Sequence, residues 1–236
     1  MGHGLWLGNF MSSDYLLFIV IPLILSIWAQ MSVSGAFRKY SRIANSAGMT
    51  GAQAAQYMLR AAGLEGSVGI ERVSGRLSDH YDPRSRVLRL SQEIHDGRSI
   101  ASLAVACHEA GHAVQHARNY APLTLRNLIV PTASFGSSMG FFLIFIGLLF
   151  HPFAFLLPVG IALFAAVVVF QIVNLPVEFD ASNRAKAMLG ELGIVRGPQE
   201  AAGVRKMLNA AAMTYVAATI AAIAQLAYYI LLNNRR

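Results

Sequence analysis

Long apolar runs alternate with polar segments along this chain. The four apolar runs cover residues 15–33, 128–150, 153–175 and 210–232. The polar segments between them are 34–127 and 176–209, and the chain ends are residues 1–14 and 233–236. A helix needs about 20 mostly apolar residues to cross a bilayer, and each run meets that length. The pattern predicts a mainly α, polytopic membrane protein with about four transmembrane helices.

The charges around the first apolar run predict how the chain is oriented. Residues 1–14 contain no Lys or Arg, whereas Arg38, Lys39 and Arg42 follow the run. Positively charged residues beside a span favour the cytoplasmic side. We therefore expect an extracytoplasmic N-terminus and cytoplasmic polar segments. Four crossings then place the tail, 233–236, outside, against the same tendency.

Composition supports a membrane as the main partner. Charged residues make up only 13% of the chain and hydrophobic residues 55%, with a mean hydropathy of +0.49. Soluble domains carry about 25% charged residues. The net charge is +7, but no basic run alternates with exposed aromatic residues, so we expect lipid and no nucleic acid as partner. Small residues in the spans would also permit an oligomer or an accessory membrane protein.

The first polar segment contains both helical and strand-like patterns. Residues 50–62 have helical spacing and end at Gly63, a typical helix terminator. VGIERV and RVLRLS alternate apolar with polar residues, and a turn is predicted at residues 82–83. A further helix-compatible stretch covers 99–117. The segment thus predicts a small α+β domain.

The sequence HEAGH, residues 108–112, lies in that last helical stretch. Because His108 and His112 are four residues apart, they share a helix face and can both bind one Zn²⁺, with Glu109 as general base. Such a short pattern also arises by chance on amphipathic helices. Cys107 precedes His108 and lies about 100° around the helix from the ligand face. We expect it to be a buried packing residue, the alternative being a thiolate that binds or inhibits the zinc.

A catalytic zinc usually has three protein ligands, so a third is needed. Glu178 is the best candidate, because it lies in NLPVEFDASNRA, where the third apolar run returns to the cytoplasm. An acidic pair at a membrane boundary is costly unless it is used. Asp180 is the alternative ligand, since the sequence does not show which carboxylate turns inward. The zinc stretch is too polar to span, so we expect the site at the cytoplasmic membrane face.

These residues predict peptide-bond hydrolysis by zinc-activated water, with Glu109 moving the proton. His80 and Tyr81 are candidates for stabilising the oxyanion, although a structural role is the alternative for both. An exposed edge of the predicted sheet could hold an extended peptide, or the sheet could simply support the helix. The substrate, a peptide or a membrane protein, stays open.

Two other functions are alternatives to hydrolysis. A non-catalytic membrane scaffold with structural zinc would need a closed site with four protein ligands. Asp180 or His116 would have to join that site, and Glu109 would stand at the base position by coincidence. A metal transporter would need ionisable residues within the spans. The four apolar runs have essentially none.

Several motifs together resemble a known family. HEAGHAVQH, EFDAS, LSDHYDPRSRVLRLS and TGAQAAQYMLRAAGL are similar to the YugP-like bacterial membrane zinc metallopeptidases, over nearly the whole chain. The resemblance implies a multi-pass protein of the bacterial plasma membrane, with His108 and His112 as zinc ligands and Glu109 as base.

A more distant similarity is to the gluzincin membrane proteases of the HtpX and CAAX-processing type. Their third-ligand glutamate corresponds to Glu178. Where they have an aspartate two residues after their EFx segment, this chain has Ser182, with Asp180 two positions earlier. Such an aspartate would orient a ligand histidine. Here either Asp180 does so from another angle or the contact is absent.

Overall fold

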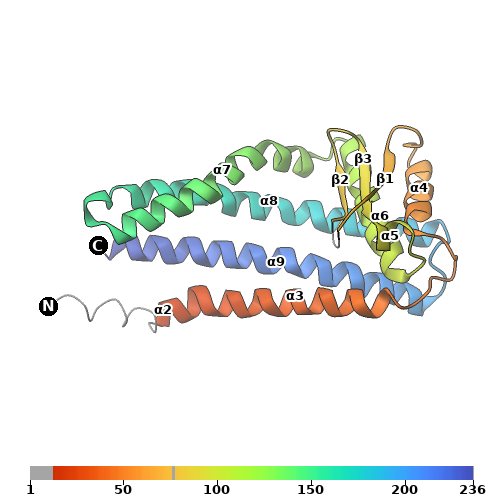
Figure 1. The fold of residues 1–236 in the computed structure, drawn as a ribbon, viewed down its shortest axis with the longest axis horizontal. Coiled ribbons are helices and arrows are strands. Elements are labelled where there is room, and N and C mark those ends of the chain that lie inside the picture. Colours follow the sequence, from red (N-terminus) through yellow and green to blue (C-terminus); the bar gives the residue numbers. More distant parts are fainter. Residues whose placement is uncertain (1–12, 76–77, 236) are drawn as a thin grey trace. The chain divides into compact units, whose positions relative to one another are not determined.

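The computed structural model describes residues 13–75 and 78–235, and most of them are helical (Figure 1). Its elements are α2 (Ser13–Tyr15), the π-helix η1 (Leu16–Val20), α3 (Ile21–Tyr40), α4 (Gly51–Ala61), β1 (Gly69–Val73), β2 (His80–Asp82), β3 (Val87–Ser91), α5 (Gln92–His95), α6 (Ile100–Ala117), α7 (Ala121–Leu149), the 3₁₀-helix η2 (His151–Phe153), α8 (Leu156–Glu191) and α9 (Pro198–Asn234). The predicted mainly α fold with a small sheet is confirmed.

The described chain forms two compact units. One contains the residues up to Gln30, Leu125–Leu175 and the residues from Thr214 onward; the other contains Met31–Thr124 and Pro176–Met213. We call them the apolar unit and the HEAGH unit. Every residue predicted from the sequence to take part in catalysis or metal binding lies in the HEAGH unit.

Among the residues that the structure describes, four helices are long and apolar enough to cross a membrane. They are Ser13–Tyr40, Ala121–Leu149, Leu156–Glu191 and Pro198–Asn234. Their number agrees with the four apolar runs, but α8 and α9 continue well past the runs that they contain. The second polar segment is therefore made largely of helix, with a break between Glu191 and Pro198.

Within the apolar unit, α7 and α8 form a helical hairpin through η2. Small residues allow the two backbones to approach each other, because a Cβ on Gly160 would lie 2.8 Å from the Gly140 carbonyl oxygen. Helix α9 packs beside them through an edge-on contact between Phe164 and Tyr229, whose ring centroids are 5.7 Å apart. Such small-residue packing is the usual means of helix association in lipid.

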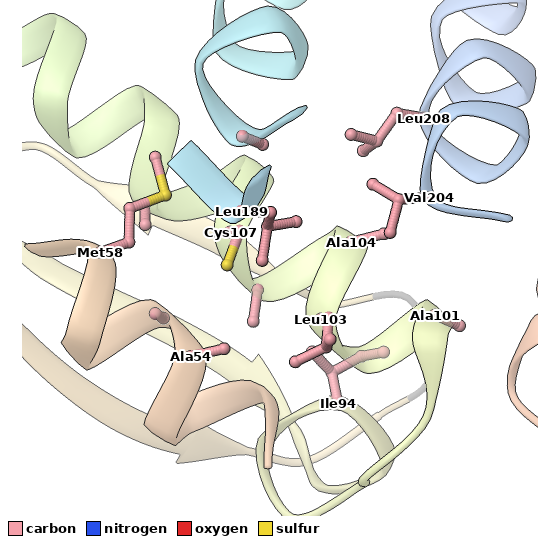
Figure 2. Packing of buried hydrophobic residues seen from close by; sticks show 14 of the residues in the cluster. Ala54, Met58, Ile94, Ala101, Leu103, Ala104, Cys107, Leu189, Val204 and Leu208 are labelled. Atoms are coloured by element: carbon pink, nitrogen blue, oxygen red, sulfur yellow. The ribbon is translucent and has the colours of Figure 1, made fainter. Parts of the chain in front are cut away.

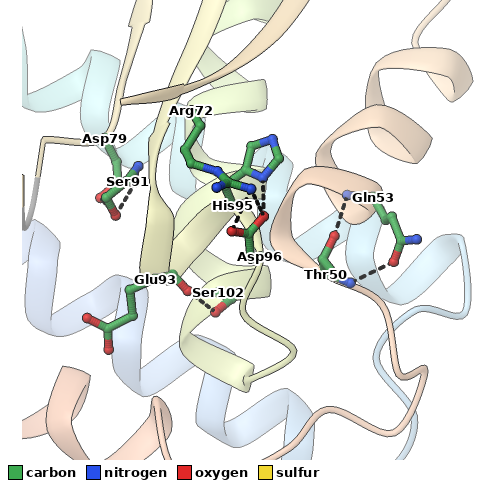
Figure 3. Close-up of polar contacts among 9 residues, drawn as sticks. All are labelled: Thr50, Gln53, Arg72, Asp79, Ser91, Glu93, His95, Asp96 and Ser102. Carbon is green, nitrogen blue, oxygen red and sulfur yellow. Dashed lines mark hydrogen bonds and ion pairs between the residues drawn. The ribbon is translucent and has the colours of Figure 1, made fainter. Parts of the chain in front are cut away.

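The sheet in the HEAGH unit has the order β1-β3-β2. Strands β1 and β3 are the two predicted strands and pair in parallel, whereas β2 pairs antiparallel with β3 and occupies an edge. The Asp79 carboxylate accepts hydrogen bonds from the Ser91 N–H (2.7 Å) and hydroxyl (3.0 Å), as Figure 3 shows. Arg89 pairs with Asp82 at 2.6 Å. These contacts fix both ends of the short edge strand.

Helix α6 forms the centre of this unit and is buried along most of its length. Ala54 and Met58 of α4 and Leu103 and Cys107 of α6 belong to one hydrophobic core (Figure 2). Cys107 is completely buried there, and burial raises the pKa of its thiol to about 12. It is thus the packing residue that we expected, and a thiolate at this position is disfavoured.

Polar side chains define where these helices begin. The Ser99 hydroxyl accepts a hydrogen bond from the Ser102 N–H at the start of α6. Thr50 and Gln53 form a reciprocal capping box at the start of α4 (Figure 3). Each contact satisfies N–H groups that a helix start would otherwise leave unpaired.

Gly111 marks a very close approach of α6 to α8. A Cβ at this position would lie 2.7 Å from the carbonyl oxygen of Ala181, and 3.2 Å from its Cα. Ala181 is itself completely buried. Real Cβ atoms do not tolerate such a distance from backbone, so only glycine permits this spacing of the two helices.

We predict that Gly111→Ala destabilises the protein, since overpacking a tight contact costs about 1–3 kcal/mol. Thermal unfolding of the detergent-purified protein measures this effect. Gly190→Ala on α8 is the matched control, because a Cβ there meets nothing within 4 Å. The control should be neutral or stabilising by up to about 1 kcal/mol, as helix propensity favours Ala. A Gly111→Ala protein as stable as the control would contradict the close approach.

Candidate metal centre

Helices α6 and α8 bring His108, His112 and Glu178 together. The Nε2 atom of His108 lies 3.2 Å from Glu178 Oε2, and the Nε2 atom of His112 lies 3.7 Å from the same oxygen. One potential ligand atom from each residue lies within 4.8 Å of the other two. The sequence predicted that these three residues form one metal site, and in the structure their side chains lie together.

This donor set fits zinc. Two imidazole nitrogens and one carboxylate oxygen are ligands that zinc takes in hydrolytic sites. Ligand atoms at about 2.0–2.1 Å from a tetrahedral zinc are about 3.3 Å apart, close to the 3.2 and 3.7 Å separations from Glu178 Oε2. The three residues therefore have both the chemistry and the spacing for one ion.

The other ring nitrogen of each histidine is also engaged. His108 Nδ1 lies 3.1 Å from the Ser182 hydroxyl, and His112 Nδ1 lies 3.0 Å from Gln115 Oε1. Because both Nδ1 atoms have partners, both Nε2 atoms are directed at Glu178. Hydrogen bonds of this type orient ligand histidines in metal sites.

The orienting contact that an aspartate would make to a ligand histidine is made here by Ser182, and not by Asp180. Ser182 itself contacts a ligand histidine, so the contact is not absent. Asp180 turns to Gln115 and Arg184: its Oδ2 accepts from Gln115 Nε2 at 2.8 Å and from Arg184 Nε at 2.5 Å. It reaches His112 only through Gln115. The structure thus directs Glu178, and not Asp180, toward the two histidines.

The surroundings of His112 are negatively charged. Burial by itself lowers the pKa of His112, but the nearby carboxylates of Glu178 and Glu109 outweigh this effect and raise the pKa. A metal ion and a proton compete for the same imidazole nitrogen. Negative charges that favour the proton therefore also favour a divalent cation there.

Glu109 lies beside this cluster and is held by the sheet. The Tyr81 main-chain N–H donates to Glu109 Oε2 at 3.0 Å, so the edge strand β2 contacts the predicted base directly. The Tyr81 hydroxyl is 2.8 Å from His116 Nδ1. His80 is exposed, and its Nδ1 lies 2.7 Å from the Ser78 carbonyl oxygen. Of the two oxyanion candidates, only Tyr81 contacts the base.

Sequence reasoning did not identify Gln115 or the contact between Tyr81 and Glu109. Gln115 carried a signal, since it is a polar residue three positions after a predicted ligand, in a helix whose buried side is mostly apolar. The Tyr81 contact joins positions 28 residues apart and had no such local signal.

Comparison with known proteins identifies the family of this chain. Residues 15–234 match the model of a family described as "Putative neutral zinc metallopeptidase". The chain is 44% identical over 223 residues to a Bacillus subtilis (strain 168) protein named "Putative membrane protease YugP", covering 94% of this chain and 98% of the relative. Comparison with the solved structures finds none that matches. The chain belongs to this neutral zinc metallopeptidase family.

Proposed function

We propose that this protein is a membrane zinc endopeptidase that hydrolyses peptide bonds at the cytoplasmic face of the membrane. The observation that carries the proposal is the convergence of His108 Nε2, His112 Nε2 and Glu178 Oε2, with Glu109 between the two histidines on α6. Membership of a zinc metallopeptidase family supports the same reaction.

Each group has a defined task in this reaction. Zinc, when bound, lowers the pKa of a water toward about 7 and polarises the substrate carbonyl. Glu109 accepts a proton from the attacking water and delivers it to the leaving amine. The Tyr81 N–H orients one oxygen of Glu109 during both transfers. This N–H is supplied by main chain, so the orientation does not depend on a flexible side chain.

The edge strand β2 is the proposed binding site for an extended substrate. Tyr81 directs its N–H away from β3 and toward Glu109, so this edge of the sheet faces the base. The N–H and C=O of one residue in an antiparallel strand point the same way, which turns the Tyr81 carbonyl to this edge as well. Pro83 follows the strand and has no N–H. The edge therefore offers few main-chain hydrogen bonds, and we expect a substrate paired over a short stretch.

The described residues favour catalysis over a structural zinc site. Structural sites usually have four protein ligands, whereas the described cluster has three. Asp180 and His116, the two residues that could close the site, are both engaged elsewhere, with Arg184 and Tyr81 respectively. A zinc ion held by these three residues would keep a fourth position for a water or a substrate.

The membrane location rests on four apolar helices and on the membrane protease to which the chain is similar. We propose the bacterial plasma membrane, with Arg38, Lys39 and Arg42 holding the HEAGH unit in the cytoplasm. The proposed partners are a peptide or membrane-protein substrate and lipid. Association with a second copy or an accessory protein is a further proposal, suggested by the small residues of the spans.

Orientation is tested by fusing a reporter that is active only in the cytoplasm after Arg42, Leu90 or Arg196. We expect activity from all three fusions, because the basic residues hold these positions inside. A fusion at Asn234 should be silent. Silence at the first three positions would reverse the orientation.

The roles of Glu109 and His112 are separated by two substitutions. The Glu109→Gln protein should keep its bound zinc, but its turnover should fall by about 10²–10⁴-fold, the usual contribution of a general base. His112→Ala should lose both zinc and turnover. Metal analysis of the purified proteins and cleavage of a peptide library give the two readouts. An active Glu109→Gln protein would refute the assignment of the base.

We propose that the Tyr81 hydroxyl stabilises the oxyanion of the tetrahedral intermediate. To reach a bound substrate, the hydroxyl has to leave His116. Loss of one oxyanion donor costs about 10²–10³-fold in kcat. Tyr81→Phe should therefore lower kcat by this order, with zinc content unchanged, because the main-chain N–H on Glu109 stays. His80→Ala is the matched control and should keep its kcat. The reverse result would move the role to His80.

A further inference from the structure

Gln115 is completely buried beside the metal centre and uses its whole amide there. Its Nε2 donates to the Val177 carbonyl oxygen and to Asp180 Oδ2, both at 2.8 Å. Its Oε1 lies 3.0 Å from His112 Nδ1. A buried amide is costly unless it is hydrogen-bonded, and all three contacts lie within the HEAGH unit.

The direction of this amide is fixed by its neighbours. A carbonyl oxygen and a carboxylate oxygen can only accept hydrogen bonds from it, so the NH₂ group must face Val177 and Asp180. The Arg184 guanidinium donates to the same Oδ2 atom of Asp180, at 2.5 Å. The amide oxygen is therefore left facing His112, and it too can only accept.

It follows that His112 must carry its proton on Nδ1. A neutral imidazole has one N–H and one lone pair, so the lone pair is on Nε2, the atom that lies 3.7 Å from Glu178 Oε2. We propose that Gln115 is a positioning residue that sets the tautomer and ring orientation of His112 for zinc binding. This inference rests on the proposed zinc site and adds a residue to it.

Ser182 does not impose the same restriction on His108. A hydroxyl both donates and accepts, so its 3.1 Å contact with His108 Nδ1 is compatible with either tautomer. The chain of contacts from His112 through Gln115 and Asp180 to Arg184 has one permitted direction at each step. Of the two contacts, the one from Gln115 therefore restricts the histidine tautomer more than the one from Ser182 does.

A purely structural role for Gln115 makes a different prediction. Its bond to the Val177 carbonyl joins α6 to α8, and loss of that bond alone would lower the stability of the metal-free protein. The affinity of the folded protein for zinc would then stay unchanged. Zinc affinity and metal-free stability must therefore be measured separately.

The first test is Gln115→Met, which keeps the volume and removes all three hydrogen bonds. Zinc affinity of the detergent-purified protein is measured by competition with a chromophoric chelator. We expect affinity to fall about 10–100-fold, the usual cost of losing a contact that orients a metal ligand. Gln56→Met on the exposed face of α4 is the matched control and should keep wild-type affinity.

The second test exchanges the amide and the carboxylate. Gln115→Glu still offers an acceptor to His112 but places a carboxylate against Asp180 and the Val177 carbonyl, so affinity should fall. Adding Asp180→Asn returns an NH₂ donor between the two side chains. The double variant Gln115→Glu/Asp180→Asn should therefore recover most of the lost affinity. A purely structural contact would show no such recovery in affinity.

The outcomes separate this inference from the proposed function. Wild-type zinc affinity in Gln115→Met overturns the positioning role while the zinc site stands. If Gln115→Met does not fold, the Gln115→Glu pair decides, and failure of Asp180→Asn to restore affinity overturns the role. A wild-type protein that binds no zinc overturns the proposed function itself.

Discussion

The close contact between α6 and α8 at Gly111 is the constraint on which the candidate site depends. Gly111 lies between Glu109 and His112, and its partner Ala181 lies between Glu178 and Ser182. A Cβ at Gly111 would meet the Ala181 carbonyl oxygen at 2.7 Å. The same contact that sets the helix spacing therefore sets the distance from the two imidazoles to the third ligand. Ligands on packed helices are held more rigidly than ligands on loops.

A site built between packed helices must also satisfy the polar groups that it buries. Glu178 is only 3% exposed, and both histidines face it. Ser182 and Gln115 contact the remaining ring nitrogens, and Tyr81 contributes main chain to Glu109. An unpaired buried polar group would cost about 1–3 kcal/mol. The polar residues around the ligands thus stabilise the fold and orient the site through the same hydrogen bonds.

What could be predicted from the sequence was what local spacing determines. Two histidines four residues apart define a helix face, and length and hydropathy define the apolar helices. Glu178 could be inferred because a carboxylate at the end of an apolar run is costly unless it has a function. The antiparallel strand β2, the contact of Tyr81 with Glu109 and that of Gln115 with Asp180 depend on partners distant in sequence. The local pattern of apolar and polar residues holds no information on such pairings, so these contacts could be seen only in the structure.

The distribution of charge gives a reason for orienting the histidines with neutral groups. Asp180 is paired with Arg184, so its charge is balanced locally and reaches His112 only through an amide. Ser182 contributes no charge to His108. Among the described residues, Glu109 and Glu178 are then the carboxylates whose charges act on His112, and one divalent cation would balance them. A further carboxylate on either Nδ1 would leave a buried excess of negative charge, which is costly in a low-dielectric interior. A hydroxyl and an amide orient the ligands without that cost.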